Sequence, residues 1–336
     1  MRLNHFWALL SMLFATNWCY LAFASDTSQI HSFKHGENSL SAYYKAPDNN
    51  AQVKGVVVFV SGDGDIPYDA YGYYDAIWER LLKSGYAIFS WDKPGVGESS
   101  GTWLGQSMAD RRSELEAEIA YVKRTYPDQS NRLGIFGFSQ AGWVVPSLLK
   151  EHQDVSFMIG VGYSINWMEQ SWYMTQLRLK REGAPEAELL NAKSQHLAEH
   201  SFWKGDPSYA DYLQTLEDSD DVMCEARFYF VKRNVSSDSS KDFAGIEKPL
   251  LVLLGENDEL VDVENTYQVL TSIFDKSQNT TIKLIPNATH GLLKYPEINS
   301  QTSSLNLLFK LWFWGESIYA PQFLKSIEEW LLTLDT

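Results

Sequence analysis

The sequence predicts an α/β fold in which a mostly parallel, doubly wound sheet carries helices on both faces. Two observations predict it. Short apolar runs rich in Val, Ile, Leu and Phe recur along the 336-residue chain, and longer stretches with helical periodicity separate them. Strands that are buried on both faces are continuous apolar runs, and strands that alternate with helices form parallel sheets.

The expected strands follow in order from these runs. Residues 29–45 are candidates for one or two leading antiparallel strands, because apolar residues such as Phe33 and Leu40 are spread through a polar stretch. Buried strands are expected at 56–60, 86–91, 133–138, 157–161, 250–254 and 281–285, where most of the runs end at Gly, Asp or Ser.

Helices are expected between the strands, at 71–83, 107–126, 140–150, 263–274 and 321–334. In the second of these, Leu115, Ile119, Val122 and Tyr126 recur at spacings of three and four residues and so form one apolar face. The alternation breaks at about 163–247, a polar helical stretch rich in Trp and Tyr. Because another buried strand follows, we expect a helical insertion that caps the carboxyl edge of the sheet, within a single domain at 25–336.

The charge of the chain limits its partners. The formal net charge is −15, and an acidic surface repels both nucleic-acid phosphates and anionic lipids. We therefore expect no nucleic-acid partner and no requirement for membrane contact. The sequence does not indicate an oligomeric state.

The N-terminus has the pattern of a signal peptide at residues 1–24. Residues 6–23 are mostly apolar, and Ala22-Phe23-Ala24 is the small-x-small pattern that signal peptidase cleaves. Cleavage after Ala24 would place the mature chain outside the cell or in the periplasm, with Cys224 as its one cysteine. An uncleaved membrane anchor is the alternative.

Ser139 lies in the motif Gly137-Phe138-Ser139-Gln140-Ala141, directly after an expected strand and at the start of an expected helix. A serine on such a sharp turn is a nucleophile elbow, whose small neighbours let strand and helix approach closely. The backbone N–H of Gln140 would then point at a substrate oxyanion from a helix N-terminus. Alone, this motif is loose, and a serine in an ordinary turn is the alternative.

An acid and a base follow two later strands. Asp258 comes after the run at 250–254, with Glu256 and Asp262 as rivals, and His290 comes after the run at 281–285. Ser139, Asp258 and His290 thus each follow a different strand. This order and context are typical of a triad in which the serine is the nucleophile, the histidine its base and the aspartate the acid that orients the base.

A glycine-rich turn, Ser61-Gly62-Asp63-Gly64, follows the expected strand at 56–60. Such a turn can present a second backbone N–H to the same oxyanion. Asp63 is the expected donor and Gly62 its rival. A turn that binds no ligand is the alternative.

These residues together resemble the α/β-hydrolase superfamily across nearly the whole mature chain. The loop Asp92-Lys93-Pro94-Gly95-Val96-Gly97-Glu98-Ser99 and the segment Thr289-His290-Gly291-Leu292 are also similar to that family. Asp92 is expected to be structural there, and Ser61 and Ala141 depart from the commoner His and Gly. The resemblance implies a serine esterase or acyl hydrolase that forms an acyl-enzyme with a small ester or acyl substrate, without metal or organic cofactor.

Other functions stay open. Serine peptidases and acyltransferases use the same triad, and a hydrolase scaffold can also be a non-catalytic binding protein. His196 and His200 fit a His-x-x-Glu-His zinc pattern, which with a third protein ligand would make a zinc-dependent hydrolase. The apolar run at 305–314 is a candidate to line the pocket or touch lipid, but simple burial is the expectation.

Overall fold

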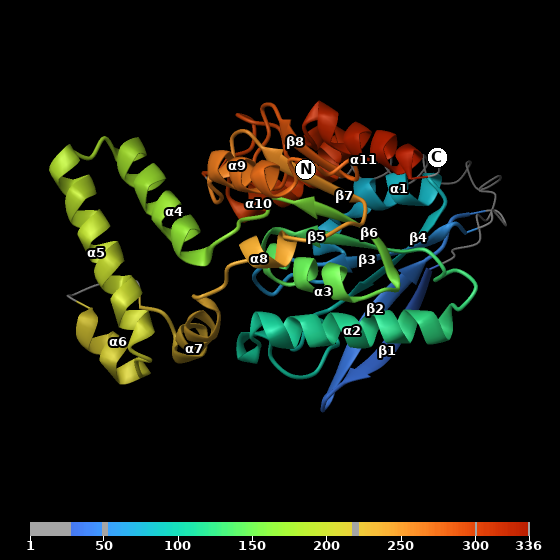
Figure 1. Ribbon diagram of the computed structural model, residues 1–336, viewed down its shortest axis with the longest axis horizontal. Helices are drawn as coiled ribbons and strands as arrows, with labels where there is room; N and C mark the ends of the chain where they lie inside the picture. Colours follow the sequence, from blue (N-terminus) through green and yellow to red (C-terminus); the bar gives the residue numbers. More distant parts are fainter. Residues whose placement is uncertain (1–27, 49–52, 217–221, 300, 335–336) are drawn as a thin grey trace, which may run out of the picture.

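The computed structural model describes residues 28–48, 53–216, 222–299 and 301–334. In this part of the chain the strands form one sheet in the order β1-β2-β4-β3-β5-β6-β7-β8. β1 (Ser28–His35) and β2 (Asn38–Lys45) form an antiparallel hairpin whose second strand pairs antiparallel with β4, and the later neighbours are parallel. Helices surround this sheet (Figure 1), which confirms the predicted fold class and the leading antiparallel strands.

The parallel strands and the helices that cover them lie close to the predicted places. The strands are β3 (Gly55–Val60), β4 (Tyr86–Trp91), β5 (Leu133–Phe138), β6 (Val155–Val161), β7 (Leu250–Gly255) and β8 (Thr280–Ile285). The covering helices are α1 (Asp75–Lys83), α2 (Met108–Thr125), α3 (Val145–Glu151), α9 (Val263–Ile273) and α11 (Pro321–Thr333). Short 3₁₀ turns precede or follow them at η1 (Ala70–Gly72), η2 (Trp103–Gly105), η3 (Ser139–Trp143) and η4 (Gly315–Ile318).

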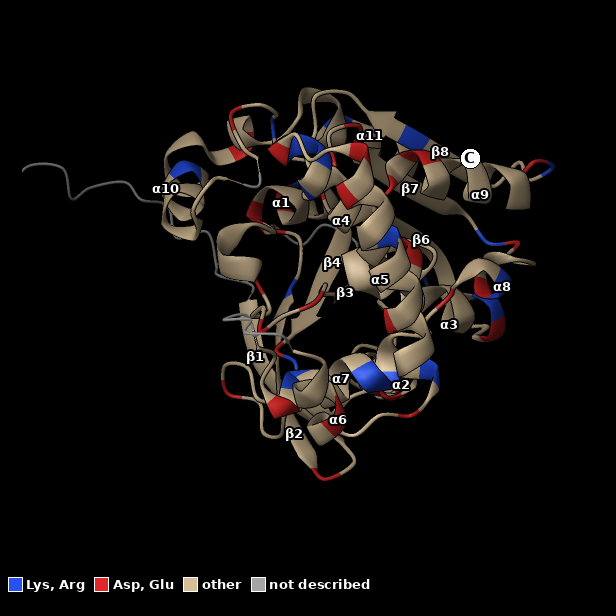
Figure 2. Cartoon of the chain, turned by 90° about the vertical axis from the view of Figure 1, so that its left-hand side faces the viewer, with Lys and Arg blue, Asp and Glu red and all other residues tan. Residues whose placement is uncertain are grey.

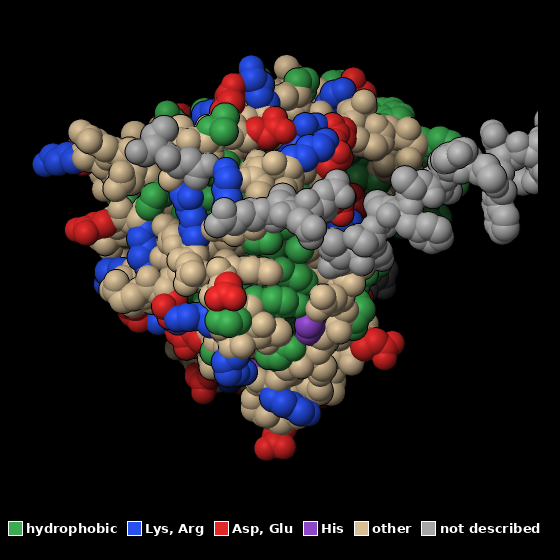
Figure 3. Space-filling model, turned by 90° about the vertical axis from the view of Figure 1, so that its right-hand side faces the viewer, with side chains coloured by type: hydrophobic (Ala, Val, Ile, Leu, Met, Phe, Trp, Pro, Cys, Tyr) green, Lys and Arg blue, Asp and Glu red, His purple; other side chains and the backbone are tan. Residues whose placement is uncertain are grey.

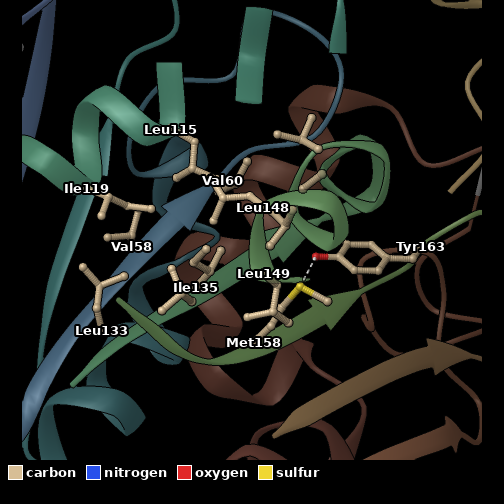
Figure 4. Packing of buried hydrophobic residues seen from close by; sticks show 14 of the residues in the cluster. Val58, Val60, Leu115, Ile119, Leu133, Ile135, Leu148, Leu149, Met158 and Tyr163 are labelled. Atoms are coloured by element: carbon tan, nitrogen blue, oxygen red, sulfur yellow. Dashed lines mark hydrogen bonds between the residues drawn. The ribbon is translucent and has the colours of Figure 1, made fainter. Parts of the chain in front are cut away.

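The strands β3 to β7 are buried on both faces, and successive side chains of each strand point to opposite sides. The expectation of a buried strand at 281–285 is wrong, because β8 lies at the edge of the sheet and only its Ile285 is buried. In β3, Val58 and Val60 pack on the face covered by α2 and α3, whereas Val57 and Phe59 pack on the face covered by α1 and α11. Figure 4 shows the first face, with Val58, Val60 and Ile135 beside side chains of α2 and α3. This double burial explains why the strands are continuous apolar runs.

Helices α4 (Trp167–Glu182), α5 (Glu186–Lys204), α6 (Tyr209–Thr215), α7 (Glu225–Asn234) and α8 (Ser240–Phe243) lie between β6 and β7 in the chain. Helices α4 to α7 extend from one side of the sheet, and Figure 2, which looks from that side, shows α5 in front of it. Part of this insertion has its own small apolar core around Phe228 and Trp203. The insertion lies where the sequence predicts one, and its action as a cap stays a prediction.

The expectation that residues 305–314 are buried is wrong. They form helix α10 (Ser304–Trp314), in which no residue is buried, and Leu305 and Trp312 are each 81% exposed. Leu307 and Leu311 pack against the core, while Leu308, Phe309 and Phe313 join the exposed stripe. A helix that lies on a surface buries only the stripe facing the core, so its hydrophobic outer residues remain in solvent.

The expected signal peptide at residues 1–24 lies outside the described residues. Within the described ranges, no helix combines the length and the hydropathy needed to cross a bilayer. On the side opposite the insertion, acidic and basic side chains are interspersed around a hydrophobic area, and neither sign gathers into one patch (Figure 3).

Candidate active site

The residues predicted to carry chemistry lie at one edge of the sheet. Parallel strands end at the same edge, and Asp63, Ser139, Asp258 and His290 follow β3, β5, β7 and β8, respectively. In the pairing of β5 with β6, Phe138 is opposite Val161. The next residues, Ser139 and Gly162, therefore leave the sheet side by side, separated by about one strand spacing of 4.8 Å.

Ser139 sits on a strained turn between β5 and η3. Its φ is +47°, in the left-handed region that residues with a side chain rarely adopt. Close packing around the turn explains why Gly137 and Ala141, two residues before and after Ser139, are small. A Cβ on Gly137 would lie 2.2 Å from the Tyr163 hydroxyl and 3.0 Å from the Ala141 methyl. Ala141 is therefore tolerated where a glycine is commoner, because residue 137 is itself a glycine.

Asp258, rather than either rival, contacts His290. Its Oδ2 lies 2.7 Å from Nδ1 of the imidazole, and its Oδ1 accepts hydrogen bonds from the backbone N–H groups of Leu260 and Val261 at 2.8 and 2.9 Å. The side chain of Asp258 has no exposed area. Glu256 is exposed, and Asp262 instead accepts the N–H of Asn265 as the N-cap of α9. The short loop after β7 thus aims one buried carboxylate at the imidazole.

The imidazole of His290 lies against the strand end beside Ser139. A Cβ on Gly162 would be 2.9 Å from Cε1 and 3.0 Å from Nδ1 of this ring, so only a glycine leaves room for it. Tyr73 fixes the following residue, because its hydroxyl donates to the Gly291 carbonyl at 2.7 Å. Ser139 Oγ makes no hydrogen bond to the ring among the described contacts. Such bonds are often long without substrate and tighten once it binds.

Two opposing effects set the pKa of His290. Burial acts to lower it, but the negative charge of Asp258 and the hydrogen bond to its carboxylate outweigh burial and raise the pKa above its ordinary value of 6.5. The side chain retains 22% exposure, so the ring can still exchange protons at the edge of the sheet. A basic imidazole that is held by a carboxylate on Nδ1 has Nε2 left to accept a proton.

The turn after β3 meets the nucleophile directly. A Cβ on Gly62 would be 3.3 Å from Cβ and 4.0 Å from Oγ of Ser139, so the turn passes close to the serine at residue 62. The backbone N–H groups of Asp63 and Gln140 make no hydrogen bond among the described residues. For Gln140 this is expected, because the first N–H groups of a helix have no partner within the helix. Two backbone donors are therefore available beside the serine.

Several residues of this site carry no motif that sequence reasoning could recognise. Gly162 and Tyr163 follow β6, and the one signal they offer is their position directly after a predicted strand. Tyr173 of α4 donates to the carbonyl of Asp258 at 2.9 Å, which links the helical insertion to the acid. Asp92 behaves as expected for a structural residue, because its Oδ1 accepts the N–H of Tyr68 at 2.8 Å.

His196 and His200 lie on α5, away from these residues. The ring of His196 stacks on Trp172, with 5.5 Å between the ring centroids, and Glu199 accepts a hydrogen bond from the indole of Trp203. Among the described residues, no three His, Cys, Asp or Glu side chains lie close enough together to hold a metal ion. The third protein ligand that a catalytic zinc needs is not found in this part of the chain.

The chain matches the family described as "Serine aminopeptidase, S33" over residues 51–297. No curated protein matches the chain in sequence. Its fold is similar to that of an esterase from Pyrococcus furiosus, with a TM-score of 0.57, 18% identity and 92% of each chain covered.

Two further solved structures have a similar fold. A proline iminopeptidase from Mycobacterium smegmatis is 14% identical, with a TM-score of 0.57 and with 91% of this chain and 99% of that one covered. A monoacylglycerol lipase from Paleococcus ferrophilus is 17% identical, with a TM-score of 0.52 and with 88% and 98% covered. At these identities the likeness concerns the fold.

The match over most of the chain identifies the class: the protein is a serine hydrolase with the α/β-hydrolase fold. Within that class, the chain belongs to the serine aminopeptidase family. This agrees with the resemblance drawn from the sequence.

Proposed function

We propose that this protein hydrolyses carboxylic esters through an acyl-enzyme on Ser139, with His290 as base and Asp258 as the acid that orients the base. One observation carries the proposal. A buried carboxylate holds Nδ1 of an imidazole at 2.7 Å, and the same ring lies against the residue beside a serine on a strained elbow. That arrangement has the roles and geometry of a hydrolytic triad.

In this proposal Nε2 of His290 takes the proton of Ser139 Oγ as the oxygen attacks the ester carbonyl. Asp258 keeps the proton on Nδ1 and stabilises the imidazolium that forms. The backbone N–H groups of Asp63 and Gln140 donate hydrogen bonds to the developing oxyanion. The imidazolium then returns its proton to the departing alcohol, and water repeats the sequence on the acyl-enzyme to release the acid. His290 mediates every proton transfer in this scheme, and the serine regains its proton when the acid is released.

Esters are favoured over peptides with a free N-terminus. An aminopeptidase needs a carboxylate that can bind the substrate ammonium group, and two acidic side chains on the loops that carry the site are already paired with arginines. Asp63 forms a two-point ion pair with Arg227, and Glu259, beside Asp258, pairs with Arg181. Peptidase and acyltransferase activity on the same triad are the alternatives to be tested.

Labelling with a fluorophosphonate tests the nucleophile. Ser139→Ala should abolish labelling, while Ser147→Ala, a half-buried serine on the neighbouring helix α3, should leave it unchanged. p-Nitrophenyl esters of graded acyl length, with aminoacyl anilides alongside, test the reaction. Hydrolysis of the anilides alone would replace the ester proposal by a peptidase. Activity that is lost with a chelator or in His196→Ala would favour the zinc alternative.

We also propose that residues 1–24 are removed and that the mature enzyme works outside the cytoplasm. The support is the apolar run at 6–23 that ends in Ala22-Phe23-Ala24. Sequencing the N-terminus of the protein purified from its own cells should find Ser25 first. A chain that still begins at Met1 in the membrane fraction would favour the uncleaved anchor.

A further inference from the structure

Three cationic side chains surround the two segments that carry the proposed oxyanion donors. Arg111 comes from α2, Lys93 from the loop after β4, and Arg227 from helix α7 of the insertion. Each of them binds the turn at residues 61–63. The reaction proposed above uses no side chain of this cluster, so its role needs a separate explanation. That explanation rests on the proposed function, because it concerns the same oxyanion donors.

Arg111 joins the two donor segments to each other. Its Nη2 donates to the Ser61 carbonyl at 2.7 Å, and its Nη1 donates to the side-chain oxygen of Gln140. Ser61 follows β3 and Gln140 follows β5, so one planar guanidinium spans two neighbouring strand ends. Arg111 is only 4% exposed, and burial of such a group is unfavourable unless its hydrogen bonds are well formed.

Two further contacts hold the same turn. Lys93 is 1% exposed and donates to the Gly62 carbonyl at 2.9 Å. The carboxylate of Asp63 accepts from Arg227 at 2.7 and 3.1 Å and from the side-chain amide of Gln140 at 3.3 Å. Each residue from 61 to 63 is therefore bound through a carbonyl or carboxylate. The carbonyls of residues 61 and 62 point toward cations, which leaves the N–H of Asp63 free.

We propose that Arg111 is a positioning residue that fixes the oxyanion donors of Asp63 and Gln140 relative to each other, while Lys93 and Arg227 hold the remainder of the turn. The physical reason is that an oxyanion hole works only when its donors are already aimed at the place where charge develops. A glycine-containing turn has no packed side chain of its own at residue 62 to hold it there. Hydrogen bonds from the buried Arg111 and Lys93 side chains and from the half-buried Arg227 supply that rigidity.

The pair Arg111 and Arg112 gives a matched test. Arg111→Lys keeps the charge but offers a single ammonium group in place of a fork, so it cannot bind Ser61 and Gln140 together. Arg112 is the next residue of α2 and pairs with Glu116 and Glu151 at the surface, so Arg112→Lys is the control. The assay is hydrolysis of p-nitrophenyl acetate, together with inhibition by a trifluoromethyl ketone, which adds to the serine and forms an oxyanion.

We expect Arg111→Lys to lower kcat by roughly 10- to 100-fold, with KM changed by less than about twofold, because a misaimed donor weakens the transition state and not the bound ester. The Ki of the ketone should rise by a similar factor. Arg112→Lys should change neither quantity. A folded Arg111→Lys protein with wild-type kcat and Ki would overturn the proposal, as would a change confined to KM.

If Arg111→Lys does not fold, the variant Arg227→Gln tests the proposal instead. Arg227 is one-third exposed, and its replacement should lower kcat several-fold with the same rise in Ki; an unchanged kcat and Ki would overturn the proposal. A wild-type protein that neither hydrolyses esters nor labels with fluorophosphonate would refute the proposed function instead. The two failures are therefore distinguishable.

Discussion

Gly162→Ala is the sharpest test of the site geometry, because the structure separates its two effects. The first is backbone strain: Gly162 has a φ of +61°, and an alanine at positive φ destabilises a fold by about 1 kcal/mol. The second is a collision. The new Cβ would lie 2.9 Å from Cε1 of His290, which is 0.5 Å less than the 3.4 Å at which ordinary contact begins.

The imidazole must therefore move by about that amount, which disturbs its alignment with Asp258 and Ser139. The backbone oxygen of His290, 3.0 Å from the same Cβ, must shift as well. Displacements of this order in a reacting group cost on the order of a hundredfold in rate. Gly183→Ala is the control, since Gly183 has a φ of +71° and nothing lies within 4 Å of its would-be Cβ. It should show the backbone strain without the collision.

We expect Gly183→Ala to lose about 1 kcal/mol in the free energy of unfolding, measured in urea. Gly162→Ala should lose at least as much, because the collision adds to the strain, and only Gly162→Ala should lose kcat toward p-nitrophenyl acetate. Equal kcat values for Gly162→Ala and the wild type, with the variant folded, would refute the placement of His290 beside residue 162. An equal loss of kcat in both variants would show that backbone strain, and not the ring, is responsible.

Three further predictions follow from the described contacts. Asp258→Asn removes both effects that raise the pKa of His290. Because the base must be neutral, the acidic limb of the kcat/KM profile should move to lower pH, while kcat falls by about 10⁴. An acidic limb at unchanged pH would contradict the pairing of Asp258 with His290. Burial, followed by the nearby charge of Arg111, lowers the pKa of Lys93 to about 7, despite opposing effects of Asp63, Glu114 and Asp65. Above that pH the unfolded chain therefore binds more protons at Lys93 than the folded chain does. The free energy of unfolding should rise by about 1 kcal/mol per pH unit between pH 7.5 and 9.5 because of this group. Urea unfolding of Lys93→Met should lack this rise, and parallel pH curves for the two proteins would refute the prediction. Trp312→Ser should change the free energy of unfolding by less than about 0.5 kcal/mol, because the Trp312 ring is exposed. Trp330→Ser removes a 6% exposed ring that packs on Phe157, so it should lower the free energy of unfolding by about 3–5 kcal/mol. Similar losses in the two variants would show that α10 is buried.

Much of the fold could be predicted because the relevant signals are local. A strand such as Gly55–Val60, buried on both faces, must be apolar throughout, and α2 shows its apolar face as a spacing of three and four residues. The elbow at Ser139 was recognisable for the same reason, since its small neighbours are needed by the turn itself. The prediction that residues 305–314 are buried was wrong, because hydropathy shows how apolar a helix is and not whether another element covers it.

Within the site, sequence alone determined which residue types follow which strands, and hence the candidates Ser139, Asp258 and His290. Only the tertiary structure decided that Asp258 and neither rival reaches the imidazole, and that Gly162 leaves space for that ring. It also brought Arg111 from a distant helix between two strand ends. The physical reason is the range of the interactions: backbone propensity and hydrophobic periodicity act over a few residues of the chain, whereas a hydrogen bond or a steric contact depends on where the folded chain returns.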